Sequence, residues 1–156
     1  MDGGIMTSRL LVDKIEGKTT SGTIQMPAGH LVQTIRMATS TTASTTGSSY
    51  VDSNLTNSIT PLFSNSIILI NLSASWVISG GAFFYTELYR NGSSISASDQ
   101  IHGDYGSSGT AYTASYMYTD VPNSTSTQTY LLKFKTTGGT AYVYKDQHMI
   151  LQEIAQ

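Results

Sequence analysis

The stretch SIILINLSASW, residues 66–76, decides the fold. From Ile67 to Ile70 every residue is apolar, so both faces of an extended strand would have to be covered. The run is far shorter than the roughly 18 apolar residues of a membrane span, and its length is that of a core strand. It predicts a central strand covered on one side by a second sheet and on the other by a loop or a neighbouring subunit. We favour the subunit, because a small sandwich rarely buries both faces of a strand by itself.

Short strands are expected along the rest of the chain. Alternation of apolar and polar residues recurs throughout the 156 residues, whereas no helical periodicity is sustained over three turns. The strands are predicted at residues 8–16, 23–26, 30–39, 55–61, 66–75, 82–90, 93–97, 110–120, 127–136, 140–144 and 148–155. Many short strands separated by turn residues are typical of a sandwich or barrel. The sequence therefore predicts an all-β, antiparallel, jelly-roll-like sandwich.

Two turns are specific enough to predict hairpins. Asn91-Gly92 lies between FFYTELYR and SSISA, and Gly138-Gly139 lies between YLLKFKTT and TAYVYK. Asparagine and glycine accept the positive φ angles of a type I′ turn. Each pair is therefore expected to join two neighbouring strands of one sheet.

The strand TYLLKFK has one apolar face and one mixed face. Tyr130, Leu132 and Phe134 are expected to face the core, while Lys133 and Lys135 face solvent. These two lysines are the nearest approach to a basic cluster in a chain with eight basic and ten acidic residues. Nucleic-acid binding usually needs a basic face that neutralises phosphates, so we exclude nucleic acid as a partner.

Composition limits the function further. The chain has no cysteine, which excludes disulfides and thiolate chemistry. Serine and threonine supply 44 residues and charged residues only 12%, so the surface is expected to be mainly hydroxyl, amide and tyrosine. The N-terminal MDGGIMTSRLL lacks a basic region followed by an apolar one, so we do not expect a secretory signal.

Residues 1–29 are predicted to form an extended arm, and residues 30–156 are predicted to form a β-sandwich head. The low-complexity residues 40–49 are expected to be a loop at the entrance to the head. The apolar residues of the arm are too scattered to form a core of their own, and an isolated pair of strands is marginal in water. They can pack on the head, on two more copies of the arm, or on another protein. We expect attachment and oligomerisation, with a trimer around one axis. The residues concerned are Leu10, Val12, Ile15, Ile24 and Met26.

The segment SASDQIHGDYGSSGT, residues 96–110, carries the most varied polar groups. Asp99, His102 and Asp104 offer oxygen and nitrogen ligands that suit several metals, but a serine- and glycine-rich loop is also polar simply because it is solvated. We favour the solvated loop and expect no metal and no cofactor. The segment's other role would be adhesion to sugar hydroxyls or to a protein epitope. The predicted receptor-binding residues are Asp99, Gln100, His102, Asp104 and Tyr105.

Catalysis is not expected. Glycan hydrolysis needs two carboxylates at a set distance, and the carboxylate inventory is thin. No nucleophile elbow and no phosphate-binding glycine loop is evident. Tyr112, Tyr116 and Tyr118 alternate on one face and are expected to stabilise the sheet through cross-strand pairs.

One family resembles this chain over most of its length. SRLLVDKIEGKTTSGTIQMPAGHLVQ, residues 8–33, resembles the N-terminal segment of small virion proteins of marine and cyanobacterial tailed phages, in which the phrase L-x-V-D-x-I-x-G-x-T-x-x-G-T-[IV]-x-[MV]-P-A-G precedes a small β domain. Residues 53–75, which include SITPLFSNSIILINLSAS, resemble a later segment of that family, although Ile67 stands where a lysine is usual. FYTELYRNGSSI, TQTYLLKFKTTGGTAYVY and ILQEIAQ resemble its closing strands. The strand order up to Glu153-Ile154 is also similar to the trimeric jelly-roll heads of the complement and tumour-necrosis-factor type.

The resemblance implies a virion structural protein. Its expected form is a trimeric tail fibre or spike, attached to other virion proteins by the arm and presenting the head for adhesion to a host-surface glycan or protein. A capsid decoration protein, of the head-fibre or cement kind, is the alternative. A carbohydrate-binding module or glycan-degrading enzyme is the third possibility.

Overall fold

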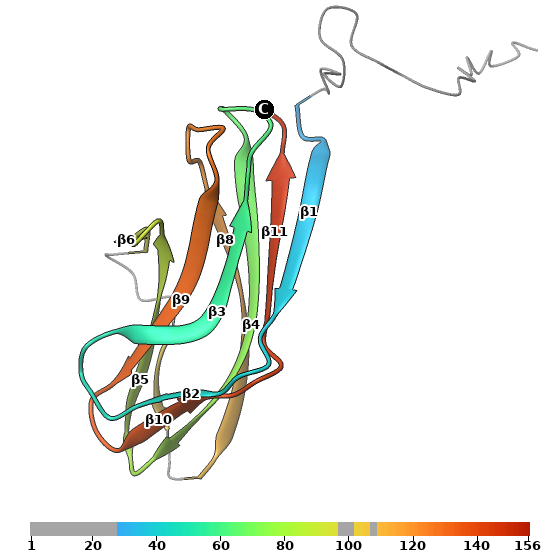
Figure 1. Cartoon of the computed structure of the whole chain (residues 1–156). Coiled ribbons are helices and arrows are strands. Elements are labelled where there is room, and N and C mark those ends of the chain that lie inside the picture. Colours follow the sequence, from blue (N-terminus) through green and yellow to red (C-terminus); the bar gives the residue numbers. More distant parts are fainter. Residues whose placement is uncertain (1–27, 97–101, 107–108) are drawn as a thin grey trace, which may run out of the picture.

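The computed structural model describes residues 28–96 and 109–156 together with the backbone of residues 102–106. This part of the chain is all-β, and none of it forms a helix that could cross a membrane. Eleven strands form two antiparallel sheets packed face to face, as the sequence predicts (Figure 1). The strands are β1 (Leu31–Ala38), β2 (Ala43–Thr45), β3 (Val51–Ile59), β4 (Ile67–Ser79), β5 (Ala82–Arg90), β6 (Ser93–Ser94), β7 (His102–Gly106), β8 (Ala111–Asp120), β9 (Gln128–Thr136), β10 (Thr140–Val143) and β11 (His148–Ile154).

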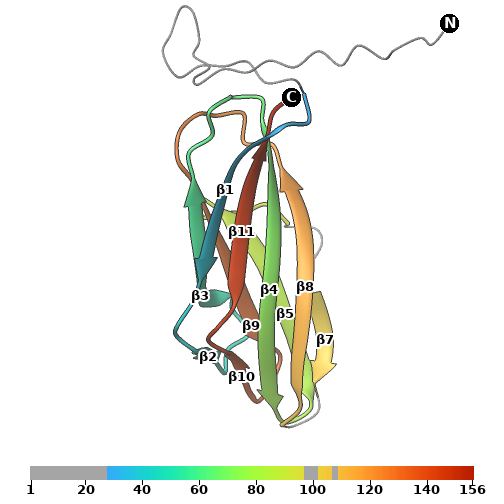
Figure 2. The same cartoon turned by 90° about the vertical axis from the view of Figure 1, so that its right-hand side faces the viewer.

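Successive strands repeatedly change sheet. The six-stranded sheet has the order β1-β11-β4-β10-β2, with β8 along the other side of β4. The five-stranded sheet has the order β3-β9-β5-β6, with β7 beside β5. Figure 2 shows β4 in the middle of its sheet, between β11 and β8. The start of β1 and the C-terminus lie at the same end of the sandwich, which we call the terminal end.

The interior follows the predicted alternation. Tyr130, Leu132 and Phe134 on β9 are completely buried. In one of two core clusters Trp76 is stacked between two rings, with centroid distances of 4.4 Å to Phe84 and 4.5 Å to Tyr112. Burial of such large aromatic side chains is a major source of stability. Tyr112 thus has the structural role predicted for it.

The inner side of the central strand β4 is covered as predicted, and a neighbouring subunit over its outer side stays a prediction. Its inward residues Ile68, Ile70 and Leu72 are at most 2% exposed, because the second sheet covers them. Its outward residues Ile67 and Leu69 are only half-buried. Within the residues that the structure describes, no second layer covers this outer side.

Two strands lie in segments predicted to be loops. β2 lies within residues 40–49 and pairs with β10, with Ala43 opposite Val143. β7 lies within residues 96–110 and pairs with β5. Both are short edge strands held by backbone pairing, so neither needs the apolar alternation by which a strand is recognised. The strands predicted at 8–16 and 23–26 lie outside the described residues.

One of the two predicted hairpins is confirmed and the other is wrong. Asn91 and Gly92, with φ angles of 49° and 83°, join β5 to β6. Gly138-Gly139 instead connects β9 of one sheet to β10 of the other. At Gly139, where φ is 62°, an added Cβ would overlap the carbonyl oxygen of Ser79. Glycine is needed there because the crossover passes directly against the backbone of another turn.

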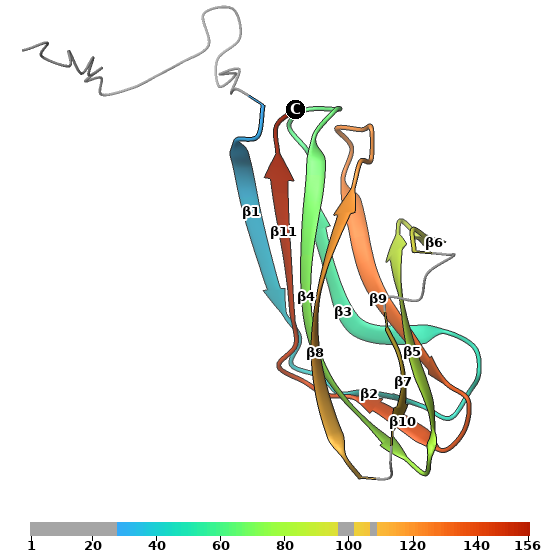
Figure 3. The same ribbon diagram turned by 180° about the vertical axis from the view of Figure 1, so that it is seen from behind.

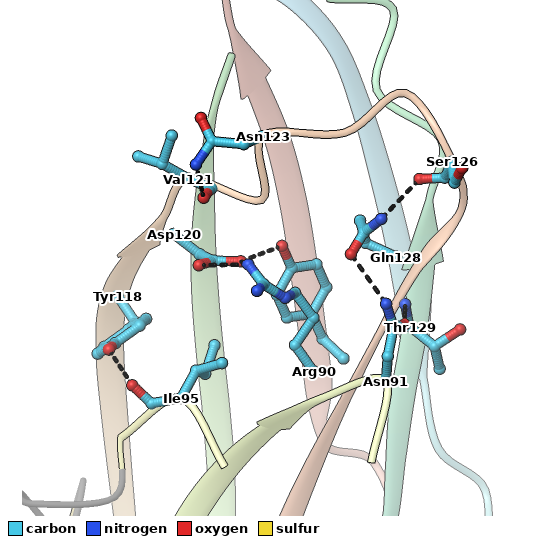
Figure 4. A network of polar contacts seen from close by, with 11 residues as sticks. Arg90, Asn91, Ile95, Tyr118, Asp120, Val121, Asn123, Ser126, Gln128 and Thr129 are labelled. Atoms are coloured by element: carbon cyan, nitrogen blue, oxygen red, sulfur yellow. Dashed lines mark hydrogen bonds and ion pairs between the residues drawn. The ribbon is translucent and has the colours of Figure 1, made fainter. Parts of the chain in front are cut away.

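A charged cluster joins the two sheets near the terminal end. Asp120, the last residue of β8, accepts hydrogen bonds from Arg90 Nη1 at 2.9 and 2.7 Å and from the Tyr130 hydroxyl at 2.7 Å (Figure 4). Burial raises the pKa of Tyr130, and the hydrogen bond to Asp120 raises it further, so the phenol stays protonated. Nearby the Tyr118 hydroxyl donates to the carbonyl oxygen of Ile95 at 2.5 Å (Figure 4). These contacts hold β8 to the strands of the opposite sheet.

A buried carboxylate fastens the connection between β3 and β4. Glu153 Oε1 accepts hydrogen bonds from the backbone N–H groups of Leu62 (2.8 Å) and Phe63 (3.1 Å) and from the Ser66 hydroxyl (2.7 Å). Its Oε2 accepts one from Gln33 Nε2 at 2.6 Å. Burial by itself raises the pKa of Glu153, but the four hydrogen bonds outweigh it and lower the pKa below that of an ordinary glutamate. The ionised side chain therefore fixes the connection that carries Leu62, which is 63% exposed.

Candidate functional site

The structure places three of the five predicted receptor-binding residues on one strand. His102, Asp104 and Tyr105 belong to β7, which pairs with β5, so the expectation of a loop was wrong for them. Asp99 and Gln100 lie outside the described residues. The predicted attachment residues also lie outside them: Leu10, Val12, Ile15, Ile24 and Met26. Because β7 extends the five-stranded sheet beside β5, the outer face of that sheet is the candidate site.

This outer face is built by alternation along two adjacent strands. On β5 the core side includes the buried Phe84, Thr86 and Leu88, and Tyr85, Glu87 and Tyr89 alternate with them on the outer side. Register sets Tyr85 opposite Lys135 of β9, and Glu87 opposite Lys133. Tyr50, just before β3, completes the group through its contact with Lys135. We call this group the tyrosine–lysine face; it consists of Tyr50, Tyr85, Glu87, Tyr89, Lys133 and Lys135.

Each lysine of the face lies against tyrosine rings. Lys133 Nζ is 4.7 Å from the ring centre of Tyr89. Lys135 Nζ is 4.4 Å from the ring centre of Tyr50 and 5.4 Å from that of Tyr85. A cation within about 6 Å of a ring centre is attracted by the negative face of the ring. These contacts hold the flexible lysine side chains over the sheet.

Burial and Glu87 together raise the pKa of two phenols of the face. The Glu87 carboxylate is nearly buried and accepts hydrogen bonds from the hydroxyls of Tyr89, at 2.9 Å, and Ser94. Burial raises the pKa of Tyr89 to about 12, with the hydrogen bond and negative charge of Glu87 adding to the effect. Burial also raises the pKa of Tyr50, and the charge of Glu87 contributes there too. Both phenols therefore keep their protons to a higher pH than an ordinary tyrosine does.

The two lysines differ in their charge partners. Lys133 Nζ lies 3.2 Å from Asp52 Oδ1, so its charge is balanced. Lys135 has its two ring contacts but no carboxylate partner among the described residues. A cation that no described carboxylate balances is the feature of this face that a ligand can use.

The geometry of the tyrosine–lysine face suits ligand binding. The tyrosine–lysine face offers aromatic surface, phenol donors and one unpaired ammonium on a rigid sheet. In the part of the chain that the structure describes, no group of three histidine or acidic residues is placed to hold a metal ion.

A depression of about 340 Å³ lies on the other sheet, between β11 and β8, where Asn71 and Ser73 of β4 line it together with Met117 and His148.

Comparisons with known proteins bear on the fold. No protein-family model matches the chain, and no curated protein matches it. A chain in the structure of infectious bursal disease virus Gx strain is similar, with a TM-score of 0.50 and 10% identity over 92% of this chain. A chain in the structure of the Gt strain gives 0.49 and 8% over 94%. This chain spans only 41% and 43% of the length of those two. At 10% identity the likeness to the Gx-strain chain shows a shared fold alone.

Sequence reasoning missed the tyrosine–lysine face as a unit. Alternation in FYTELYR and YLLKFK already showed that tyrosines and lysines share the solvent side of their strands. It did not show that these two strands are neighbours, nor that Tyr50 reaches the same place.

Proposed function

We propose that this chain is a virion structural protein, a trimeric tail fibre or spike that joins the particle through residues 1–29 and binds the host surface with its head. The resemblance of residues 8–33 to phage virion proteins supports the attachment role. The similarity of the sandwich to a chain in the structure of infectious bursal disease virus Gx strain is consistent with it. Capsid decoration is the second candidate, supported by the same two likenesses.

The observation that carries the adhesive role is where the tyrosine–lysine face lies. The segment proposed for attachment joins β1 at the terminal end. β9 ends, and β3 and β5 begin, toward the opposite end, so Tyr50, Tyr85 and Lys135 lie away from the terminal end (Figures 1 and 3). A head held at the terminal end would present these residues outward.

The proposed role is binding without catalysis. Three carboxylates accept hydrogen bonds from the fold itself. They are Glu87, Asp120 and Glu153. Each of the three therefore has a role in holding the fold, which favours a binding function over a catalytic one.

A homotrimer is supported by the outer side of the six-stranded sheet. Met117 is 69% exposed there, and Leu69 and Ile150 are half-buried. We assign this surface to a second copy of the chain, because cyclic symmetry would cover the same apolar residues in every copy. Met117→Lys should shift the protein from trimer toward monomer in analytical ultracentrifugation, whereas Thr113→Lys, on the same strand, should have less effect. A monodisperse wild-type monomer would contradict the assignment.

Purified particles test the proposal as a whole. A fibre or spike should be rare relative to the shell protein in quantitative mass spectrometry, whereas a decoration protein should approach shell stoichiometry. Removal of residues 1–29 should leave a folded head that no longer incorporates into particles. Incorporation of the shortened chain at the normal level would refute the attachment role. Release of reducing sugars from host polysaccharide would instead indicate a glycan-degrading enzyme.

A further inference from the structure

We infer that Lys135, Tyr50 and Tyr85 form a subsite for the carboxylate of an acidic saccharide, a uronic acid unit of a surface polysaccharide. The inference rests on the proposed function and adds the chemical class of the ligand. It begins with the ammonium of Lys135, which the two rings hold at 4.4 and 5.4 Å and which no described carboxylate balances. A ligand carboxylate on the side away from the rings would form a charge-assisted hydrogen bond with it.

The phenols supply the rest of the recognition. The Tyr50 hydroxyl is a donor at neutral pH, as any phenol is, and burial together with the charge of Glu87 raises its pKa further. The hydroxyls of Tyr50 and Tyr85 can bond to sugar hydroxyls, which donate and accept equally well. Phe83, which is 45% exposed and stacks on Tyr85 at a centroid distance of 5.9 Å, extends the aromatic surface for the apolar face of a sugar ring.

The charges of the face select a monoanion. Lys133 is already paired with Asp52, and Glu87 places a negative charge on the same face. One unpaired cation beside two carboxylates suits a single negative charge per sugar, whereas a phosphate monoester carries about −1.5 to −2 near neutral pH. A polyuronate, with one carboxylate per unit, matches the face.

Binding of the full-length chain to immobilised polygalacturonate tests the inference, with neutral dextran and dextran sulfate as comparison surfaces. Lys135→Gln should weaken polygalacturonate binding about tenfold, the loss of one charged contact. Lys145→Gln removes the same charge from an exposed site in the connection between β10 and β11, and binding should be unchanged. Tyr50→Phe removes one donor and keeps the ring, so it should weaken binding less than Lys135→Gln. Circular dichroism should show that all three variants are folded.

Equal weakening by Lys135→Gln and Lys145→Gln would mean attraction by overall charge and would overturn the subsite. So would absence of polygalacturonate binding, equal binding to dextran, or preferential binding to dextran sulfate. Particle composition separates this failure from failure of the proposed function. A chain that is present on particles but does not bind polygalacturonate refutes the subsite alone, whereas absence from particles refutes the virion role.

Discussion

Glu153→Ala is the change whose effect the structure specifies most fully. The substitution removes the acceptor of four hydrogen bonds and leaves four donors behind. A buried donor left without a partner costs about 1–3 kcal/mol. Ser66 is completely buried and keeps its penalty, while Gln33 and the connection that carries Leu62 can turn toward water. We therefore expect the free energy of unfolding to fall by about 3 kcal/mol, a large part of the 5–15 kcal/mol of a typical domain.

Urea denaturation measures this loss, with Trp76 as the probe because it is the chain's one tryptophan and is stacked in the core. In thermal unfolding the same loss should lower the Tm by roughly 10 °C. Gln152→Ala, one residue away on the half-exposed outer side of β11, is the matched control. If both variants lose the same free energy, the hydrogen bonds to Glu153 do not stabilise the terminal end as argued.

The sign of the pH dependence gives a second readout of the same carboxylate. The pKa of Glu153 is lowered in the folded state, while in the unfolded chain it is about 4.3. The stabilisation is therefore complete above the unfolded value and is lost as the pH falls through the lower, folded value. Glu153→Gln should unfold more readily than the wild type at neutral pH, and this difference should shrink toward acidic pH. A difference that stays constant would contradict the assignment.

Three further outcomes are expected. Gly139→Ala should lower the free energy of unfolding by several kcal/mol in urea denaturation, because its Cβ would overlap a backbone carbonyl. Gly92→Ala, at a similar positive φ in open space, should lower it by about 1 kcal/mol. Equal losses would contradict the crossover geometry. Glu87→Gln should lower the pKa of Tyr89 from about 12 toward 10 in an ultraviolet titration of the phenolate, and an unchanged pKa would mean that burial alone is responsible. Asp120→Ala should lower the free energy of unfolding by about 3 kcal/mol, because it leaves the partly buried Arg90 and the buried Tyr130 without their acceptor. A loss below about 1 kcal/mol would show that this link between the sheets is not stabilising.

Much of the fold could be predicted because the local alternation of apolar and polar residues shows which side chains of a strand are buried. β5 was predicted with its observed bounds, and the core side of β9 was correct at Tyr130, Leu132 and Phe134. The turn at Asn91-Gly92 was predictable because positive φ angles restrict the residue types. β3 begins at Val51, four residues before its predicted start at Leu55. The prediction missed these residues because a register shift, in which Asn54 has a positive φ of 66°, interrupts the alternation.

Alternation by itself determined that this chain forms short antiparallel strands with one side buried. The polarity of a side chain indicates whether its side of the strand is buried or exposed to solvent, and nothing more. Tertiary structure decided which strands are neighbours. It turned Gly138-Gly139 into a crossover between sheets and placed β7 on a sheet edge. It also brought Tyr50 against Lys135, far away in sequence, to form the tyrosine–lysine face. Pairing between distant strands depends on the packing of the whole sandwich, so no local pattern encodes it.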